Sequence, residues 1–431
     1  MFIPRSARRI RFARAAFVLV GLLPCAALVG WAVHRHSATH RDAIRCEWEQ
    51  ALGLPIAIAS VEHPLPGSVR ARGCALAAAD GRPAFTVSAV DVETSPTEVR
   101  LRIGSLGCDP AGAAVLAGLA GEWLWRGARF RRDVVVDVAD FAWEVPGAGG
   151  HATRQPLGAI RIECVTQAGA RALRVVRRHA DDGADEVRIV RTGGDGTGSD
   201  RVVIEASGAE PVPWAIVAAV AARGPVAALP FGVAAAAHGR LAATCVDGCW
   251  SGTASGRVER VDLAACTAPL HAGATGTMDI PVHGIEWRDG RLTAARFACE
   301  AGAGHADRRL LEALVTTLGC RAGAAYVGPT PDVASAFDAA GCEVRIDGRG
   351  IELAGTPRLG GALAVVAGRP LLEAPAGVVP PERLAWLLAP SGAVYVPSSG
   401  PGSWLMSVLP AGGEPADRTP RVGRTAAGGG F

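Results

Sequence analysis

The sharpest cluster of chemically capable residues is Cys245-Val-Asp-Gly-Cys249. If Asp247-Gly248 forms a two-residue turn between strands, Cys245 faces Trp250, and the two sulfurs lie on opposite faces of the hairpin. A three-residue loop would instead place the cysteines opposite each other and permit a disulfide. A zinc site would need a second cysteine or histidine pair, and none accompanies this motif. We favour two free thiols without a metal, with the disulfide as the alternative.

Two further groups combine side chains that can ligate cations. One consists of His34, His36 and His40, which lie among arginines and fit a solvated flank better than a metal site. The other follows His179 and consists of Asp181, Asp182, Asp185 and Glu186. This acidic group lacks the alternating oxygen ligands and the glycine of an EF-hand loop, and a charged hairpin tip explains it equally well. We expect no metal ligands in either group.

Tryptophan is the third residue type with a possible binding role. Tryptophans could line a ligand groove, although at strand and helix positions they more often belong to the core; they are Trp123, Trp125, Trp143, Trp214, Trp250, Trp287, Trp386 and Trp404. The sequence contains no Gly-x-Ser-x-Gly, His-Glu-x-x-His, phosphate-binding or dinucleotide-binding glycine motif. We therefore expect no catalytic residues, no cofactor and no enzymatic activity, and the pattern identifies no specific ligand-binding residue.

The elements that must position these residues begin with the uncharged stretch 15–33. Nineteen helical residues span about 28 Å, close to the thickness of a bilayer's hydrocarbon core. The basic residues before the stretch, Arg5, Arg8, Arg9, Arg11 and Arg14, outnumber those after it, Arg35, Arg41 and Arg45. This asymmetry predicts a cytoplasmic amino terminus and an exported remainder.

A cleaved signal peptide is the alternative to a retained anchor. The apolar stretch is long for a signal peptide, and it ends at Trp31 with His34, Arg35 and His36 where a small-x-small cleavage site would be needed. Retention is therefore favoured. Pro24 lies within the stretch and is expected to kink the helix.

Composition excludes some partners. The chain has 431 residues and a formal charge of only +3, much of it from the arginines before the apolar stretch, so no nucleic-acid surface is expected. The eleven cysteines form no dense framework. Cys74, Cys299 and Cys342 lie among apolar neighbours, where a free cysteine acts as a small hydrophobic residue, although some could pair in an oxidising compartment.

Beyond residue 53 the hydrophobic residues change to a period of two, which predicts about twenty short strands. Glycine-arginine pairs recur at Asp80-Gly81-Arg82, His238-Gly239-Arg240, Ser255-Gly256-Arg257, Asp289-Gly290-Arg291 and Asp347-Gly348-Arg349. Glycine supplies the positive φ of hairpin turns, so these pairs predict turns in an antiparallel meander. The fold class is thus mainly β, a curled antiparallel sheet of repeated hairpins with a few short helices behind one transmembrane helix.

Two hairpins allow a register to be predicted. A two-residue loop at Asp289-Gly290 sets Trp287 against Leu292 and Ile285 against Ala294. A four-residue loop from 347 to 350 sets Ile346 against Ile351, Arg345 against Glu352 and Val344 against Leu353. The shorter loop at 347 would oppose Glu343 to Glu352, and like charges directly opposite are destabilising.

Helices are predicted at 110–124, 211–222, 307–318 and 381–388, where Pro or Asp precedes an apolar stripe. Residues 146–155 and 192–200 are predicted loops. The chain divides into a cytoplasmic basic segment 1–14, a transmembrane helix 15–33, a juxtamembrane amphipathic helix 34–53, a first β-rich region 54–207, a second β-rich region 208–410 and a disordered tail 411–431.

The apolar span, the short helix and the segment GLPIAIASVEHPLPGSVRARGCALAAADGRPAFTVSAVDVE together resemble the start of AsmA-like envelope proteins. The later segments WSGTASGRVERVDL, HGIEWRDGRLTAARFACEAG, ADRRLLEALVTTLG and CEVRIDGRGIELAG are similar to that family's repeating strands. The resemblance implies a single-pass protein of the bacterial inner membrane, exported to the periplasm, whose sheet binds or moves membrane lipid in an apolar groove. It implies no catalytic residues.

Strand period alone does not separate an open groove from a closed sandwich. The alternative function is a non-catalytic scaffold that holds an envelope protein partner at the membrane.

Overall fold

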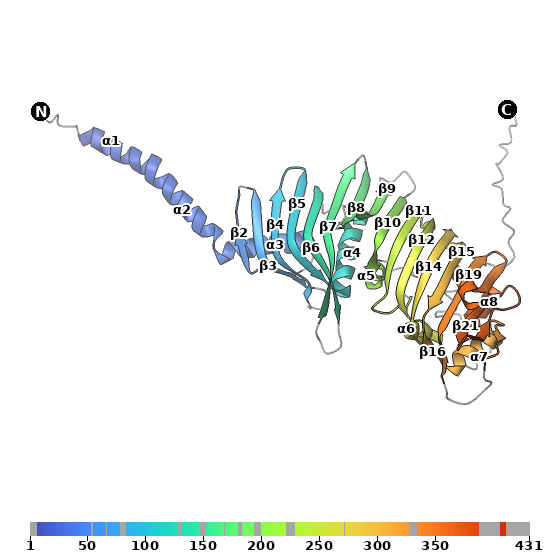
Figure 1. Cartoon of the computed structure of the whole chain (residues 1–431). Helices are drawn as coiled ribbons and strands as arrows, with labels where there is room; N and C mark the ends of the chain where they lie inside the picture. The colour runs from blue at the N-terminus through green and yellow to red at the C-terminus, as the bar shows by residue number, and fades with distance from the viewer. Residues whose placement is uncertain are drawn as a thin grey trace, which may run out of the picture. The chain divides into compact units, whose positions relative to one another are not determined.

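We analysed a computed structural model that describes residues 7–52, 55–65, 67–77, 83–126, 132–146, 152–167, 169–179, 183–193, 200–220, 229–270, 272–326, 334–387 and 406–410. The chain forms two compact units, Met1–Ala184 (unit 1) and Asp185–Phe431 (unit 2). The protein is mainly β, as predicted, with an apolar helix near the amino terminus and strands whose ladder does not close on itself (Figure 1). The predicted boundary between residues 207 and 208 falls inside a strand of unit 2.

The amino-terminal helix is continuous but changes its winding. It consists of α1 (Ala7–Phe17), a π-helical turn η1 (Val18–Leu22) and α2 (Leu23–Arg35). The stretch Arg14–Arg35 is long and apolar enough to cross a membrane, and none of it is buried in the protein. The π-turn comes directly before Pro24, which has no N–H and crowds the carbonyl four residues earlier, so the wider turn accommodates it.

A short turn joins this helix to α3 (Ala38–Leu52). The Ser37 hydroxyl accepts the backbone N–H of His40 at 3.2 Å and donates to the carbonyl of His34 at 2.6 Å, so one side chain ends one helix and begins the next. Ile44 is buried, which agrees with the amphipathic helix predicted at 34–53. Residue 53, the predicted stop, lies outside the described residues.

Unit 1 is built on one run of paired strands. Its strands are β1 (Ile56–Ala57), β2 (Ser60–Glu62), β3 (Ser68–Ala77), β4 (Pro83–Thr94), β5 (Glu98–Cys108), β6 (Asp133–Pro146), β7 (Ala152–Gln167) and β8 (Ala170–Arg178). Both β1 and β2 pair with β3, and the ladder then continues in chain order to β8. Within each regular stretch of strand, alternate residues therefore lie on the same face.

One pairing departs from the predicted antiparallel meander: β5 and β6 are parallel. Between them lies α4 (Pro110–Arg126), which begins behind Asp109, whose carboxylate accepts the N–H of Gly112 at 2.7 Å. Seventeen helical residues extend about 26 Å, enough to return the chain along most of β5. Asp133 therefore lies beside Glu98 at the start of β5, and the two strands run in the same direction.

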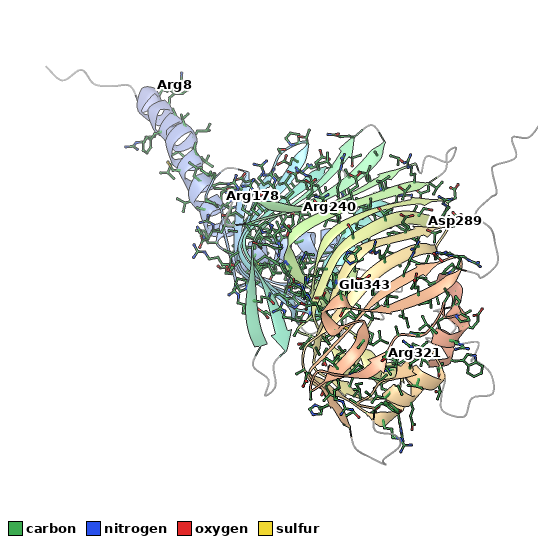
Figure 2. All side chains as sticks on the ribbon, turned by 45° about the vertical axis from the view of Figure 1, so that its right-hand side comes forward. Arg8, Arg178, Arg240, Asp289, Arg321 and Glu343 are labelled. Carbon is green, nitrogen blue, oxygen red and sulfur yellow. The ribbon has the colours of Figure 1, made fainter. Side chains whose placement is uncertain are left out.

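Unit 2 contains the longer ladder. Its successive strands are β9 (Ala184–Thr192), β10 (Arg201–Pro213), β11 (Ala236–Val246), β12 (Cys249–Asp262), β14 (Thr277–Arg288), β15 (Arg291–Ala301) and β19 (Ala339–Asp347), all antiparallel. The far edge of β19 pairs with β20 (Gly350–Gly355) and β21 (Ala362–Val366), and β21 continues to β22 (Arg369–Glu373) and β17 (Arg321–Ala322). Figure 2 shows these strands lying side by side, each of them curved.

Short elements pack along the ladder of unit 2. They are α5 (Trp214–Val220), α6 (Leu263–Thr267), α7 (Arg308–Thr316), α8 (Pro381–Leu387), the 3-10 turns Ala268–Leu270 and Pro357–Leu359, and a small sheet of β13 (Ala274–Thr275), β16 (Gly304–Ala306) and β18 (Ser335–Phe337). Asp307 caps α7 by accepting the N–H of Leu310 at 2.7 Å. A core cluster lies between α7, the end of the ladder and the segment that contains Leu409.

Two of the five glycine-arginine pairs are not turns. Gly239 and Gly256 lie in the middle of β11 and β12 and face each other across the ladder, with φ of 148° and 151°. A Cβ at either position would lie 2.6 Å from the other glycine's Cα, so these strands approach too closely for any side chain. The pairs at 289 and 347 do form turns, and the pair at 81 lies outside the described residues.

The two predicted registers are largely confirmed. Ile346 faces Ile351 and Val344 faces Leu353, as the loop at 347–350 requires. In the other hairpin Trp287 faces Leu292, but Ile285 faces Ala295 instead of Ala294. The reason is a bulge at Thr293, whose hydroxyl donates to the carbonyl of Glu286 at 3.0 Å.

Two predicted segments had wrong boundaries. Residues 146 and 152–155, predicted as a loop, belong to β6 and β7, because Val145 pairs with Thr153 and Pro146 with Ala152. Residues 211–213, predicted as helical, complete β10, and α5 begins only at Trp214. The helices at 110, 307 and 381 begin where predicted to within one residue. The tail 411–431 lies outside the described residues.

Candidate functional site

Unit 1 has one apolar face. Along the ladder, directly opposed residues form what we call apolar row 1, which runs across six strands as Val69, Val92, Leu101, Val136, Ile162 and Val175. All six side chains are partly exposed. Six strands at about 4.8 Å give this row a length of roughly 24 Å.

Farther along the same strands, large side chains are buried. Phe85, Cys108 and Trp143 are neighbours in register there, and Trp143 is only 1% exposed. Helix α4 packs against β4, β5 and β8 and buries Trp123 and Leu124. α4 therefore packs on one part of this sheet, while the side chains of apolar row 1 remain partly exposed.

The opposite face of unit 1 is charged. Opposed residues alternate in sign as Arg70, Asp91, Arg102, Asp137 and Arg161. Arg70 donates to Asp91 at 2.8 Å, which holds the pKa of the Asp91 carboxyl below its usual value, and Arg102 pairs with Glu93 at 3.1 Å. A hollow of about 510 Å³ on this face is lined by Arg70, Arg72 and Arg102, each of which is in an ion pair. An anionic ligand there would have to displace these carboxylates.

Unit 2 repeats the division into two faces. Its apolar row 2 runs in register as Ala206, Leu241, Ala254, Ile285, Ala295, Ile346 and Ile351. The first four side chains are partly exposed, and the last three are buried, with Ile351 only 1% exposed. Apolar row 2 is therefore open at β10–β14 and closed at β15–β20, where the core cluster covers it.

The tryptophans separate into core and surface. Trp123, Trp143 and Trp214 are buried, and the Trp214 indole donates to the carbonyl of Leu229 at 3.2 Å. Trp250 and Trp287 instead lie on the open part of unit 2's apolar face, where the Trp287 ring lies over Gly252. The core assignment was thus correct for some tryptophans only. Trp404 lies outside the described residues.

The cysteine motif forms the two-residue turn. Asp247 and Gly248 both have positive φ, Val246 faces Cys249, and Cys245 faces Trp250. Cys245 is buried and Cys249 is exposed on the other face, and both thiols are free. This hairpin therefore has the geometry that excludes a disulfide between its two cysteines.

The juxtamembrane histidines acquire a partner that the sequence motif did not include. His40 Nε2 lies 2.8 Å from Nε2 of His63, and the His34 ring lies 5.5 Å from the His40 ring. The Ser68 carbonyl lies 3.3 Å from Nδ1 of His63, so Nδ1 carries the hydrogen and Nε2 accepts from His40. Burial lowers the pKa of both His40 and His63, and their proximity lowers that of His40 further. The pair joins α3 to the segment after β2.

The acidic group forms no cation loop in the described part of the chain. Asp185 is buried and accepts the N–H of Ala209 at 2.7 Å, so it supports the irregularity in β10. Asp181 and Asp182 lie outside the described residues. Among those described, no group of three or more His, Cys, Asp or Glu side chains is arranged to hold a metal ion.

Comparison with protein-family models, curated protein sequences and solved structures finds no match for this chain. The function must therefore be inferred from the two apolar rows and from the amino-terminal helix, which is long and apolar enough to cross a membrane.

Proposed function

We propose that this protein is a single-pass envelope protein of the bacterial inner membrane that binds or helps to move membrane lipid on its exported β-rich region. Apolar rows 1 and 2 bind acyl chains in this proposal, and no catalytic step is involved. The observation that carries it is apolar row 1: six aliphatic side chains, opposed in register on six strands, all partly exposed.

Length and chemistry support an acyl chain as the ligand. One leaflet of a bilayer's hydrocarbon core is about 15 Å thick, and apolar row 1 is roughly 24 Å long. Apolar contact contributes about 25 cal/mol per Å² removed from water, without directional requirements. A flexible methylene chain therefore matches a row that offers aliphatic groups and no hydrogen-bonding side chains.

The membrane placement rests on the apolar helix and its flanks. Arg35 packs over the Trp31 ring at 4.0 Å at the helix end, as expected for side chains at a membrane interface. Five arginines before the span and three after it favour a cytoplasmic amino terminus and a periplasmic sheet. The resemblance to AsmA-like envelope proteins agrees with this proposal.

Site-specific photocrosslinking of the full chain in its native membrane tests the proposal. A benzophenone amino acid at Ile162 or Leu241 should form adducts with lipids labelled in their acyl chains. The matched controls are Arg161 and Thr253. Arg161 is next to Ile162 in β7, and Thr253 is next to the residue that faces Leu241, so both lie on the opposite, polar face of their strands. Equal labelling from both faces, or none from the apolar face, would contradict lipid binding. Stoichiometric protein adducts without lipid would favour a scaffold.

A further inference from the structure

Cys299 and Cys342 lie directly opposite each other in the pairing of β15 with β19. Both are free thiols of intermediate exposure on the apolar face of unit 2, and Cys342 packs against the edge of the core cluster. Directly opposed residues of antiparallel strands have Cα atoms about 4.5 or 5.5 Å apart. Disulfides join residues whose Cα atoms are about 4.4–6.8 Å apart, so either kind of pair allows a disulfide without backbone movement.

The two thiols also interact before any oxidation. The hydrogen bond from the Cys299 thiol lowers the pKa of Cys342, and the same interaction raises that of Cys299. The thiolate is the reactive form in exchange with disulfides, so Cys342 is the better nucleophile of the pair. Burial raises the pKa of the neighbouring Cys320 thiol to about 11, which leaves that cysteine protonated and unreactive.

We propose that Cys299 and Cys342 are an oxidation site that forms a cross-strand disulfide when a small molecule or protein bearing a disulfide reaches this face. The Cys342 thiolate attacks one sulfur of the oxidant, whose S–S bond breaks and releases one thiol. Cys299 then loses its proton and attacks the Cys342 sulfur, and the second half of the oxidant leaves as a thiol. Two electrons pass to the oxidant, and each cysteine gives up one hydrogen.

This bond would join two strands that are distant in the sequence. The segment between Cys299 and Cys342 carries β16, α7 and β18, which contribute Ala306, Leu311 and Phe337 to the core cluster over the closed part of apolar row 2. β15 is paired with β14 on its other edge, which belongs to the open part. The disulfide would therefore fasten the first strand pair of the closed part, next to the strand at which the open part ends.

The test uses the reduced full chain in detergent micelles, exposed to oxidised glutathione at about pH 8. Free thiols are then blocked with N-ethylmaleimide, and the protein is digested and analysed by mass spectrometry. We expect a linked peptide pair containing Cys299 and Cys342 and a loss of about 2 Da for the two hydrogens. The Cys299→Ser variant should carry glutathione trapped on Cys342.

Cys245 and Cys249 provide a matched control, because they are close in sequence but lie on opposite faces of their hairpin. They should form no link with each other under the same conditions. N-ethylmaleimide on both Cys299 and Cys342 after exposure to oxidised glutathione would show that neither thiol had been oxidised, and would overturn the proposal. So would separate glutathione adducts on the two cysteines, or a link from Cys342 to Cys320.

Discussion

The two ends of apolar row 2 have the same residue types but different surroundings. At β19 and β20, Ile346 and Ile351 are buried by the core cluster that includes Leu311 and Leu372. At β11 and β14, Leu241 and Ile285 have the same alternation in sequence, and they remain partly exposed. In Figure 2, Arg240 and Asp289 mark the open strands and Glu343 marks β19. The difference shows that hydrophobic alternation determines which face of the sheet is apolar. The helices and short strands inserted between the ladder strands determine whether that face is covered.

The largest expected effect contrasts Ile351→Ala with Ile285→Ala. Ile351 is almost fully buried, so its truncation should lower the free energy of unfolding by about 2–5 kcal/mol. Ile285 is partly exposed and only packs against the edge of the core cluster, so its truncation should cost less, about 1–2 kcal/mol. Urea denaturation of the full chain in micelles, followed by tryptophan fluorescence, measures both. Equal losses would mean that apolar row 2 is covered along its whole length.

The close approach of β11 and β12 on the open side gives the second prediction. Gly239→Ala would place a Cβ 2.2 Å from the Ser255 carbonyl oxygen at a positive φ, so we expect a loss of about 1–3 kcal/mol. Gly284→Ala in β14 is the control, since no atom lies within 4 Å of its added Cβ. The same denaturation assay should show little change for Gly284→Ala. A tolerated Gly239→Ala would contradict the close approach.

A smaller effect is expected when the open end is made polar. Leu241→Asn should remove about 1 kcal/mol of apolar contact with a bound chain, a drop of roughly fivefold in lipid occupancy. A benzophenone amino acid at Ile285, two strands away in the same row, measures this occupancy by photocrosslinking. The control Thr253→Asn, on the polar face, should leave crosslinking unchanged. An unchanged signal in Leu241→Asn would place the lipid elsewhere.

The smallest effect concerns neither end of apolar row 2 but the histidine pair. His40 and His63 have pKa values lowered by folding, so their contribution to stability is present above the unfolded value of about 6.5 and is lost as pH falls below it. Arg35, His34 and His36 nearby add positive charge against protonation. Proton NMR titration of the two imidazoles should show both low pKa values, and His63→Gln should raise that of His40.

Acidification should leave both apolar rows unchanged, because aliphatic contacts do not titrate. Hydrogen exchange at about pH 5.5 and 7.5, corrected for the intrinsic rates, should therefore show faster opening in α3 and unaltered protection in β14 and β19. Faster opening throughout the ladder would indicate that the histidine pair stabilises more than its own segment.

Local patterns predicted most of the fold. The period of two located the strands, and the charge pairing of Arg345 with Glu352 selected the correct register, because these signals depend on neighbouring residues. The parallel β5–β6 pair was missed, since it depends on how far α4 carries the chain. Gly239 and Gly256 were mistaken for turns because a glycine required by close strand approach has the same sequence signature as a glycine in a turn.

The candidate site was only partly predictable. The sequence indicated apolar faces but could not show that apolar row 2 closes at Ile346, since the covering elements come from several distant segments. The pairs His40–His63 and Cys299–Cys342 join residues 23 and 43 positions apart in the sequence. A search for ligand residues at short spacing could find neither pair.

The order of the ladder from β9 to β15 has a consequence for evolution. Strands β9 to β12 pair in chain order, and so do β14 and β15, so the gain or loss of one hairpin within either run would leave the remaining hydrogen bonds intact. Such a duplication would lengthen the exposed aliphatic track by about 10 Å per hairpin. Duplication or deletion of the DNA that encodes one hairpin would therefore change the length of this track. The core cluster that covers the end of the ladder would stay the same.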